Sequence, residues 1–107
     1  MRIFWVYILS CSNGAYYTGY TTDLVRRYRE HCAGTNKCKY TRSFTPVGLA
    51  QCWQVIDNQA LAMTIEKYIK KMSKVKKEQL IADPQVLAQL FDCLPLEKDK
   101  ITNILQT

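Results

Sequence analysis

The sequence predicts a small α+β domain with a mainly antiparallel, three-stranded sheet flanked by helices and a short C-terminal helical tail. Two early segments rich in aromatic and branched residues are joined by Asn-Gly. A third segment alternates apolar and polar residues, and several later segments repeat apolar residues at helical spacing. The expected order is strand, strand, helix, strand, helix, helix, and 107 residues suffice for one such domain.

The first two strands are expected at residues 2–11 (RIFWVYILSC) and 15–21 (AYYTGYT), because both are rich in aromatic and branched side chains. Asn13-Gly14 lies between them and is a strong signal for a hairpin turn. A loop of two residues and a loop of three residues both fit this signal.

The loop length decides which face of the sheet each side chain takes. A two-residue loop sets Cys11 opposite Tyr16, whereas a three-residue loop with a left-handed glycine sets Cys11 opposite Ala15. A slip of one residue turns every side chain to the other face. Tyr7 and Tyr17 therefore share a face in the three-residue register and lie on opposite faces in the two-residue register.

The first helix is expected to run to about Ala33. Its candidate N-caps are Thr21, Thr22 and Asp23. The residues at core-facing spacing are Val25, Tyr28 and Cys32. Arg27 and His31 are four residues apart, so they stand side by side on a neighbouring stripe, which we expect to face a cleft.

A polar, basic loop is expected at residues 33–46, and residues 47–56 alternate as a third strand. A helix then begins at residues 57–59. Its expected core stripe comprises Leu61, Ile65, Tyr68, Ile69 and Met72. Lysines line the other side of this helix, and a further helical piece, broken from it near Ser73, continues to Ile81.

The last part of the chain predicts a helical tail. Asp83-Pro84 is typical of a cap followed by proline in the first helical turn, and Pro95 ends that helix. Its apolar stripe comprises Leu87, Leu90, Phe91 and Leu94. A short final helix is expected to contain Ile101, Ile104 and Leu105. We expect a domain at residues 1–82 and a helical extension at residues 83–107 that packs on or near it.

The positive charge is concentrated in residues 1–81, which carry +8, whereas residues 82–107 carry −2. A basic body predicts a polyanionic partner, with nucleic acid first and an anionic membrane surface second. No apolar run approaches the roughly 18 residues that span a membrane, and the N-terminal run lacks the features of a signal peptide. We therefore expect a cytoplasmic protein without a membrane segment.

The five cysteines are odd in number and irregularly spaced, which disfavours a disulfide framework, and the absence of a C-x-x-C pair disfavours zinc. The carboxylates of the basic body are not clustered in sequence, which disfavours two-metal chemistry, but one Mg²⁺ on a single carboxylate is feasible. A single histidine excludes paired-histidine catalysis within one chain.

Arginine can bind phosphate in a bidentate manner, and a tyrosine can act as a base if positive charge lowers its pKa from about 10.

Several motifs together resemble the GIY-YIG nuclease domain family, in its small single-domain bacterial form. The signature elements correspond to WVY (residues 5–7) and YTG (residues 17–19). They are followed by YTTDLVRRYREH, which resembles the arginine helix of the family. KYTRSFTPVGL and IEKYIKKMSKVKKEQLI resemble later segments, so that the resemblance extends from about Phe4 to Ile81.

The resemblance implies DNA phosphodiester cleavage with one divalent metal, Mg²⁺ or Mn²⁺. Matched residue by residue, it implies that Tyr7 and Tyr17 are the signature tyrosines, Arg27 the catalytic arginine and Glu66 the metal-binding glutamate. His31 falls where some relatives have tyrosine or histidine. The candidates for DNA contact are Gly19, Arg26, Lys39, Tyr40, Arg42, Lys70 and Lys74. Trp5 replaces the glycine of the first signature element.

Each candidate also has a plain structural explanation. Arg27 can pair with Asp23, and Glu66 with Lys70, at i,i+4 spacing, while Tyr7 and Tyr17 suit any strand. Our hypothesis is a metal-dependent endonuclease of the DNA repair or recombination type that acts on branched, flapped or nicked duplexes, with Tyr7 or His31 as the base. The alternatives are a non-catalytic nucleic-acid-binding module and an adaptor that uses the tail for a protein partner or a homodimer.

Overall fold

The computed structural model describes residues 1–34 and 45–105, and the side chains as far as Thr102. Their elements are β1 (Ile3–Cys11), β2 (Tyr16–Thr21), α1 (Leu24–Ala33), β3 (Pro46–Ile56), α3 (Gln59–Lys70), α4 (Lys74–Ala82), α5 (Gln85–Leu90), β4 (Leu94–Pro95) and α6 (Lys98–Leu105). The strands form one antiparallel sheet in the order β2-β1-β3-β4. The α+β prediction is confirmed, with a two-residue fourth strand that it lacked.

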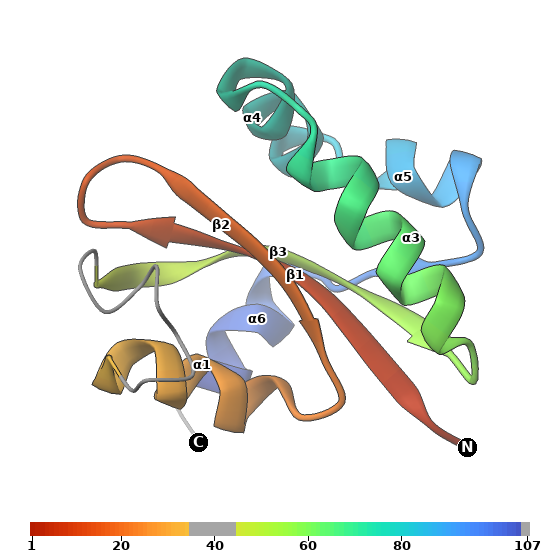
Figure 1. Cartoon of the computed structure of the whole chain (residues 1–107), viewed down its shortest axis with the longest axis horizontal. Helices are drawn as coiled ribbons and strands as arrows, with labels where there is room; N and C mark the ends of the chain where they lie inside the picture. Colours follow the sequence, from red (N-terminus) through yellow and green to blue (C-terminus); the bar gives the residue numbers. More distant parts are fainter. Residues whose placement is uncertain (35–44, 106–107) are drawn as a thin grey trace.

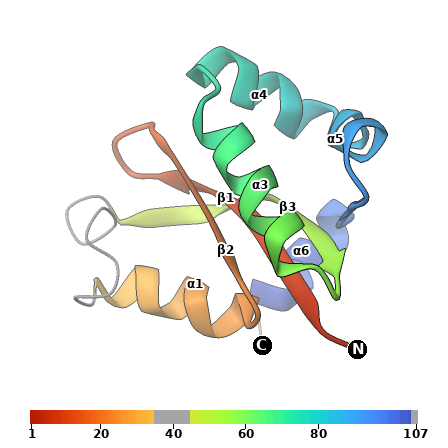
Figure 2. The ribbon, with the colours of Figure 1, turned by 45° about the vertical axis from the view of Figure 1, so that its right-hand side comes forward.

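The sheet is covered by helices on both faces (Figures 1 and 2). On one face, α3, α4 and α5 pack over a core that includes Val6, Ile8 and Trp53. On the other face, α1 and α6 pack over a smaller cluster that includes Tyr7 and Leu9. Consecutive residues of β1 therefore enter different cores, as the alternation of a strand requires.

The β1–β2 hairpin adopts the three-residue register. The backbone N–H of Cys11 donates to the carbonyl of Ala15 at 2.9 Å, and Gly14 takes the left-handed conformation with φ 81°. In this register Tyr7 lies opposite Gly19. Tyr7 and Tyr17 consequently share the face of the sheet that α1 covers.

Helix α1 begins after Asp23, whose side chain accepts a hydrogen bond from Arg26 N, and it ends at Gly34 in a left-handed conformation. Tyr28 packs against the core as expected, but the prediction is wrong for Val25 and Cys32, neither of which is a buried residue of α1. Leu24 and His31 are the buried residues of this helix, while Cys32 is exposed. Leu24, Arg27, Tyr28 and His31 follow the i, i+3, i+4, i+7 pattern, so the stripe that faces the sheet also contains a charge and the histidine.

Helices α3 and α4 begin as predicted, after the N-caps Asn58 and Ser73. Ile65 and Ile69 are buried in the expected stripe of α3. Tyr68 departs from that prediction, because 40% of it is exposed and its ring packs edge-on against Phe91.

Residues 83–105 follow the predicted order less closely. Asp83 is the C-cap of α4 and makes no side-chain N-cap bond to α5, because Pro84 takes the N-cap position. Helix α5 ends at Leu90, so that Leu90 and Leu94 are exposed and Leu87 alone of the predicted stripe is fully buried. After α5 the chain pairs along β3 as β4 instead of continuing as a helix.

Contacts with β3 hold the last residues against the sheet. Trp53 Nε1 donates to the carbonyl of Pro84 at 3.0 Å, Gln51 Nε2 donates to that of Leu96 at 2.7 Å, and Ile101 is buried beneath α1 and β1 residues. The expected division into residues 1–82 and 83–107 stays a prediction. Among the described residues, no helix has both the length and the apolar character needed to cross a bilayer.

Candidate functional site

Three aromatic rings from three elements meet between the sheet and α1. The rings of Tyr17 on β2 and His31 on α1 have centroids 4.8 Å apart, and the ring of Tyr7 on β1 lies 5.8 Å from that of His31. The centroids of Tyr7 and Tyr17 are 6.4 Å apart. The hairpin register places the two tyrosines, and the α1 stripe places the histidine against both.

The hydroxyl of Tyr7 and Nε2 of His31 form a buried hydrogen bond of 3.0 Å. His31 has no exposed surface and Tyr7 has 2% exposed. The expectation that His31 faces an open cleft is therefore wrong, because the histidine belongs to the sheet-facing stripe of α1. The tautomer of His31 decides which of the two atoms donates.

Gly19 provides the space that the Tyr7 phenol occupies. A Cβ atom at this position would lie 2.5 Å from Tyr7 Oη and 2.8 Å from Tyr7 Cζ, both closer than side-chain carbons approach other atoms. Gly19 does not have a positive φ, so backbone conformation does not require glycine here. The requirement comes from the close approach of the phenol.

The pKa of His31 is lowered to about 4, chiefly by burial and next by the nearby charge of Arg27, against a smaller opposing effect of Glu30. A histidine in water has a pKa of about 6.5. His31 is therefore neutral at pH 7, with one ring nitrogen that can donate and one that can accept a hydrogen bond.

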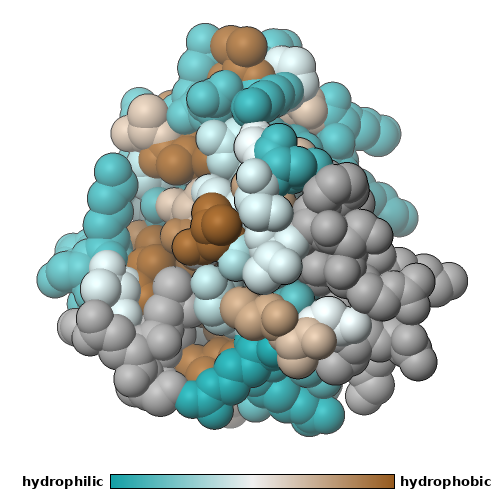
Figure 3. Space-filling model, turned by 90° about the vertical axis from the view of Figure 1, so that its left-hand side faces the viewer, coloured by the Kyte–Doolittle hydropathy of each residue, from teal (hydrophilic) through white to brown (hydrophobic). Residues whose placement is uncertain are grey.

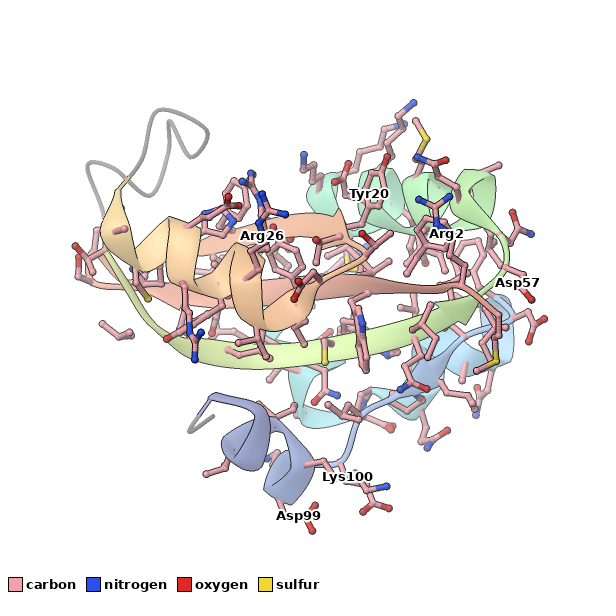
Figure 4. The ribbon with its side chains drawn as sticks, turned by 90° about the horizontal axis from the view of Figure 1, so that it is seen from below. Arg2, Tyr20, Arg26, Asp57, Asp99 and Lys100 are labelled. Atoms are coloured by element: carbon pink, nitrogen blue, oxygen red, sulfur yellow. The ribbon has the colours of Figure 1, made fainter. Side chains whose placement is uncertain are left out.

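Arg27 lies one helical turn before His31 and is half-buried. Its side chain is 23% exposed and its Nη1 pairs with Glu30 Oε1 at 3.2 Å. The neighbouring Arg26 is 69% exposed and also pairs with Glu30, at 3.7 Å. Figure 4 shows Arg26 extending from α1 toward the same side of the molecule as Tyr20 on β2. The partner Glu30 was not singled out from the sequence, although its i+3 and i+4 spacing from the two arginines indicates it.

Glu66 lies in a different layer from the three rings. It is on α3, which packs on the opposite face of the sheet, and its carboxylate is 17% exposed and pairs with Lys70 at 3.5 Å. Strand β2 separates the two layers and is an edge strand of the described sheet. Helix α3 reaches this edge, where Gln59 Nε2 donates to the hydroxyl of Tyr20 at 3.4 Å. A ligand lying along β2 would therefore have α1 on one side and α3 on the other.

A divalent metal fits this arrangement if it is held by the single carboxylate of Glu66. Within residues 1–34 and 45–105, no three histidine, cysteine or acidic side chains are grouped so that they enclose an ion. Mg²⁺ commonly keeps several waters and binds one or two carboxylates together with substrate phosphates. Glu66, partly buried yet reachable by solvent, suits this kind of site, and the donor set does not suit a closed protein cage.

The remaining candidates for DNA contact divide into two groups. Lys70 and Lys74 are exposed, and Lys74 lies at the start of α4 beside the hairpin, its Nζ 3.7 Å from where a Cβ of Gly14 would be. Lys39, Tyr40 and Arg42 fall outside the described residues.

Gly19→Ala is expected to destabilise the fold by about 2 kcal/mol, because overpacking a buried site typically costs 1–3 kcal/mol. The added methyl would displace the Tyr7 phenol from His31. Urea unfolding measures the loss. Gly48→Ala is the matched control, since a Cβ at Gly48 meets no atom within 4 Å. Equal stability of the two variants would show that the space beside Tyr7 is not needed.

The sequence matches the GIY-YIG catalytic domain over residues 3–79. It is 48% identical over 79 residues to a UPF0213 protein of Natronomonas pharaonis, covering 74% of this chain and 91% of that protein. A UPF0213 protein of Halobacterium salinarum is 49% identical over 75 residues, 70% of this chain and 95% of the relative. The solution NMR structure of the UPF0213 protein BH0048 from Bacillus halodurans has a TM-score of 0.46 and 41% identity, covering 75% of this chain and 83% of that one.

Proposed function

Because the chain belongs to the GIY-YIG catalytic domain family, a family of nuclease domains, we propose that it is a metal-dependent DNA endonuclease. Its substrates would be nicked, flapped or branched duplexes. The observation that carries this proposal is the cluster of Tyr7, Tyr17 and a neutral His31, with Arg27 one turn away on the same helix. Phenol, neutral imidazole and guanidinium together can bind and polarise a phosphodiester and a water.

Arg27 would bind the scissile phosphate and stabilise the negative charge that grows on it during attack. A guanidinium can donate two parallel hydrogen bonds to phosphate oxygens. Its pairing with Glu30 and its partial burial limit the orientations that the side chain can take. A donor fixed before the reaction begins stabilises the transition state without reorganisation.

Tyr7 is better suited than His31 to take the proton of the attacking water. An imidazole with a pKa of about 4 is a weak base. A neutral His31 with its proton on Nε2 would instead donate to the Tyr7 oxygen and stabilise the phenolate, as a hydrogen bond to the charged form does. Tyr7 would act as the base in its ionised form, after its own proton has passed to solvent. The phenolate would then take a proton from water as the water oxygen bonds to phosphorus, and the ester oxygen would leave as an alkoxide. His31 is accordingly a positioning residue, and Tyr17 would help to orient the water.

Glu66 would hold the divalent cation. When bound, Mg²⁺ or Mn²⁺ stabilises the charge that develops on phosphate and leaving oxygens. Lys70 pairs with this carboxylate at 3.5 Å, so its ammonium lies close to where a phosphate bound to the cation would be. The single carboxylate leaves the other coordination positions to water and DNA.

The charged residues surround the β2 edge in a way that suits DNA. Figure 3 looks onto the hairpin end of the molecule, where hydrophilic side chains gather over α4 at the top and over α1 at the bottom. Between them this face is mostly weakly polar, with several hydrophobic patches. A phosphate backbone that crosses this face would meet α1 arginines and α3–α4 lysines on either side of the reactive tyrosines.

A cleavage assay tests the proposed function. Wild-type protein should cut nicked, flapped or branched DNA when Mg²⁺ or Mn²⁺ is present and stop when the metal is chelated. Glu66→Gln should raise the Mg²⁺ concentration for half-maximal cleavage roughly 10- to 100-fold, the cost of losing one charged contact. Salt-sensitive binding without a metal-dependent product would instead indicate the non-catalytic module. Activity that appears only with a second protein would indicate the adaptor.

A further inference from the structure

A groove lies at the junction of α3 and α4, apart from the cluster around Tyr7. It begins in a pocket of about 480 Å³ lined by Tyr68, Lys71, Met72, Ser73 and Lys76. A second pocket of about 370 Å³ shares Met72 and Lys76 with the first and continues past Gln79, Leu80, Asp83 and Val86. Because the two pockets share lining residues and are neighbours, we call them together the α3–α4 groove. The first pocket alone has the volume of sites that hold small organic ligands.

Tyr68 gives the α3–α4 groove an aromatic surface that the fold does not fully use. The residue is 40% exposed, although it occupies a position of α3 that the sequence assigns to the core. Its ring packs edge-on against Phe91, with centroids 5.3 Å apart and planes at 70°. This contact fixes the orientation of the ring. A fixed, exposed ring beside the flexible thioether of Met72 is suited to a flat aromatic ligand.

The charges of the α3–α4 groove are uneven along its length. Lys71 and Lys76 line the first pocket together with no acidic residue, and α4 carries no acidic side chain in its first turn. In the second pocket Lys76 is joined by Asp83. An anionic group would therefore be held at the Tyr68 end, between the two lysines, and not at the Asp83 end.

We propose that the Tyr68 end of the α3–α4 groove binds one unpaired nucleotide of a DNA strand. Its base would stack on Tyr68 and Met72, and its phosphate would lie between Lys71 and Lys76. Stacking on an aromatic ring beside basic side chains is the general way in which proteins hold single strands without reading their sequence. The proposal rests on the proposed function, and it names the unpaired strand of a flap as the part of the substrate that this domain grips.

The groove and Glu66 lie on different sides of α3, because Tyr68 follows Glu66 by about 200° around the helix axis. A strand that connects them would pass over the C-terminal end of α3. Lys70 and the C-cap Lys71 are located there. Lys71 is about 8 Å farther along the axis than Glu66, so few nucleotides are needed to link the two positions.

Fluorescence anisotropy with a labelled single strand of about 15 nucleotides, without divalent metal, tests this site. Tyr68→Leu and Lys76→Gln should each weaken binding of the single strand about tenfold, within the range for losing a stacked base or a phosphate contact. Binding of a blunt duplex of the same length should change less than about twofold. Tyr68→Phe should bind as the wild type does, because it keeps the ring. Lys100→Gln is the matched charge control, since α6 lies on the far side of the sheet from α3 (Figure 4).

The proposal is overturned if Tyr68→Leu binds the single strand like the wild type, or if strand and duplex binding weaken equally. It is also overturned if deoxyadenosine monophosphate displaces the strand at an equal concentration, which would identify a site for free nucleotides. Arg27→Ala separates this result from the proposed function. If single strands bind through Tyr68 but no DNA is cut, the groove proposal stands and the proposed nuclease function fails. If cleavage depends on Arg27 but Tyr68→Leu binds the single strand like the wild type, the nuclease function stands and the groove proposal fails.

Discussion

Arg27→Ala should slow DNA cleavage about 10³-fold, the effect expected when a fixed cationic donor to a reacting phosphoryl group is removed. The loss should appear in kcat, because the contact between the Arg27 guanidinium and the phosphate strengthens as negative charge grows on the phosphate. The partly exposed ion pair with Glu30 that this change removes contributes no more than about 1 kcal/mol to stability. Single-turnover cleavage and urea unfolding measure the two quantities separately.

Arg26→Ala is the matched comparison for this prediction, because it removes the same charge from the adjacent position of α1 and also breaks a pair with Glu30. Its guanidinium is 69% exposed and turned away from His31's stripe, so we expect a few-fold rise in KM and an unchanged kcat. Arg27→Lys should recover little activity, because an ammonium cannot donate in the bidentate manner of a guanidinium. Similar losses of kcat in Arg26→Ala and Arg27→Ala would show that charge alone matters.

The hairpin shows how far local sequence determines this site. Asn-Gly between two aromatic segments predicts the turn, but both loop lengths satisfy that signal. The three-residue loop is stabilised by its left-handed glycine, while the core decides that Tyr7 faces α1. The candidate site depends on this register, because the two-residue register would have placed Tyr7 and Tyr17 on opposite faces of the sheet.

Helix α1 shows why the rest of the site could not be predicted. By hydropathy, Val25 and Cys32 are better core residues than Arg27 and His31, and the predicted stripe followed hydropathy. The sheet instead presents a phenol and a glycine at this point, so the helix packs with the imidazole inward, where it gains a buried hydrogen bond. The Tyr7 hydroxyl on β1 therefore overrides the preference of α1 for turning apolar residues toward the core. The residue pattern of the helix alone does not contain this information.

Long-range pairing explains the misjudged tail as well. The sequence of residues 94–95 has no strand pattern of its own. These residues form a strand because they pair with the edge of β3. The carbonyl of Leu96 then accepts a hydrogen bond from the buried Nε2 of Gln51. The apolar spacing from Leu87 to Leu94 is real, but the backbone of β3 competes for the chain and ends α5 early.

Acidification is expected to destabilise the protein by roughly 3 kcal/mol through His31 alone. In the folded state this side chain stays neutral down to a pH of about 4, whereas in the unfolded chain it binds a proton near pH 6.5. Between these values the unfolded state binds more protons, so the free energy of unfolding falls as the pH falls from 6.5 toward 4. Above pH 6.5 the full stability is present, and below about pH 4 this contribution has been lost.

His31→Gln isolates that effect between pH 6.5 and 5, because the chain has one histidine and no other side chain has an ordinary pKa in this narrower range. The variant should be less stable than the wild type at pH 7 but should lose less stability down to pH 5, where carboxylates begin to titrate in both proteins. Urea unfolding at several pH values gives the two curves. Parallel curves would mean that His31 becomes protonated in the folded protein near pH 6. The group that donates to the Tyr7 oxygen would then be a charged imidazole, and our assignment of a neutral His31 to this role would be wrong.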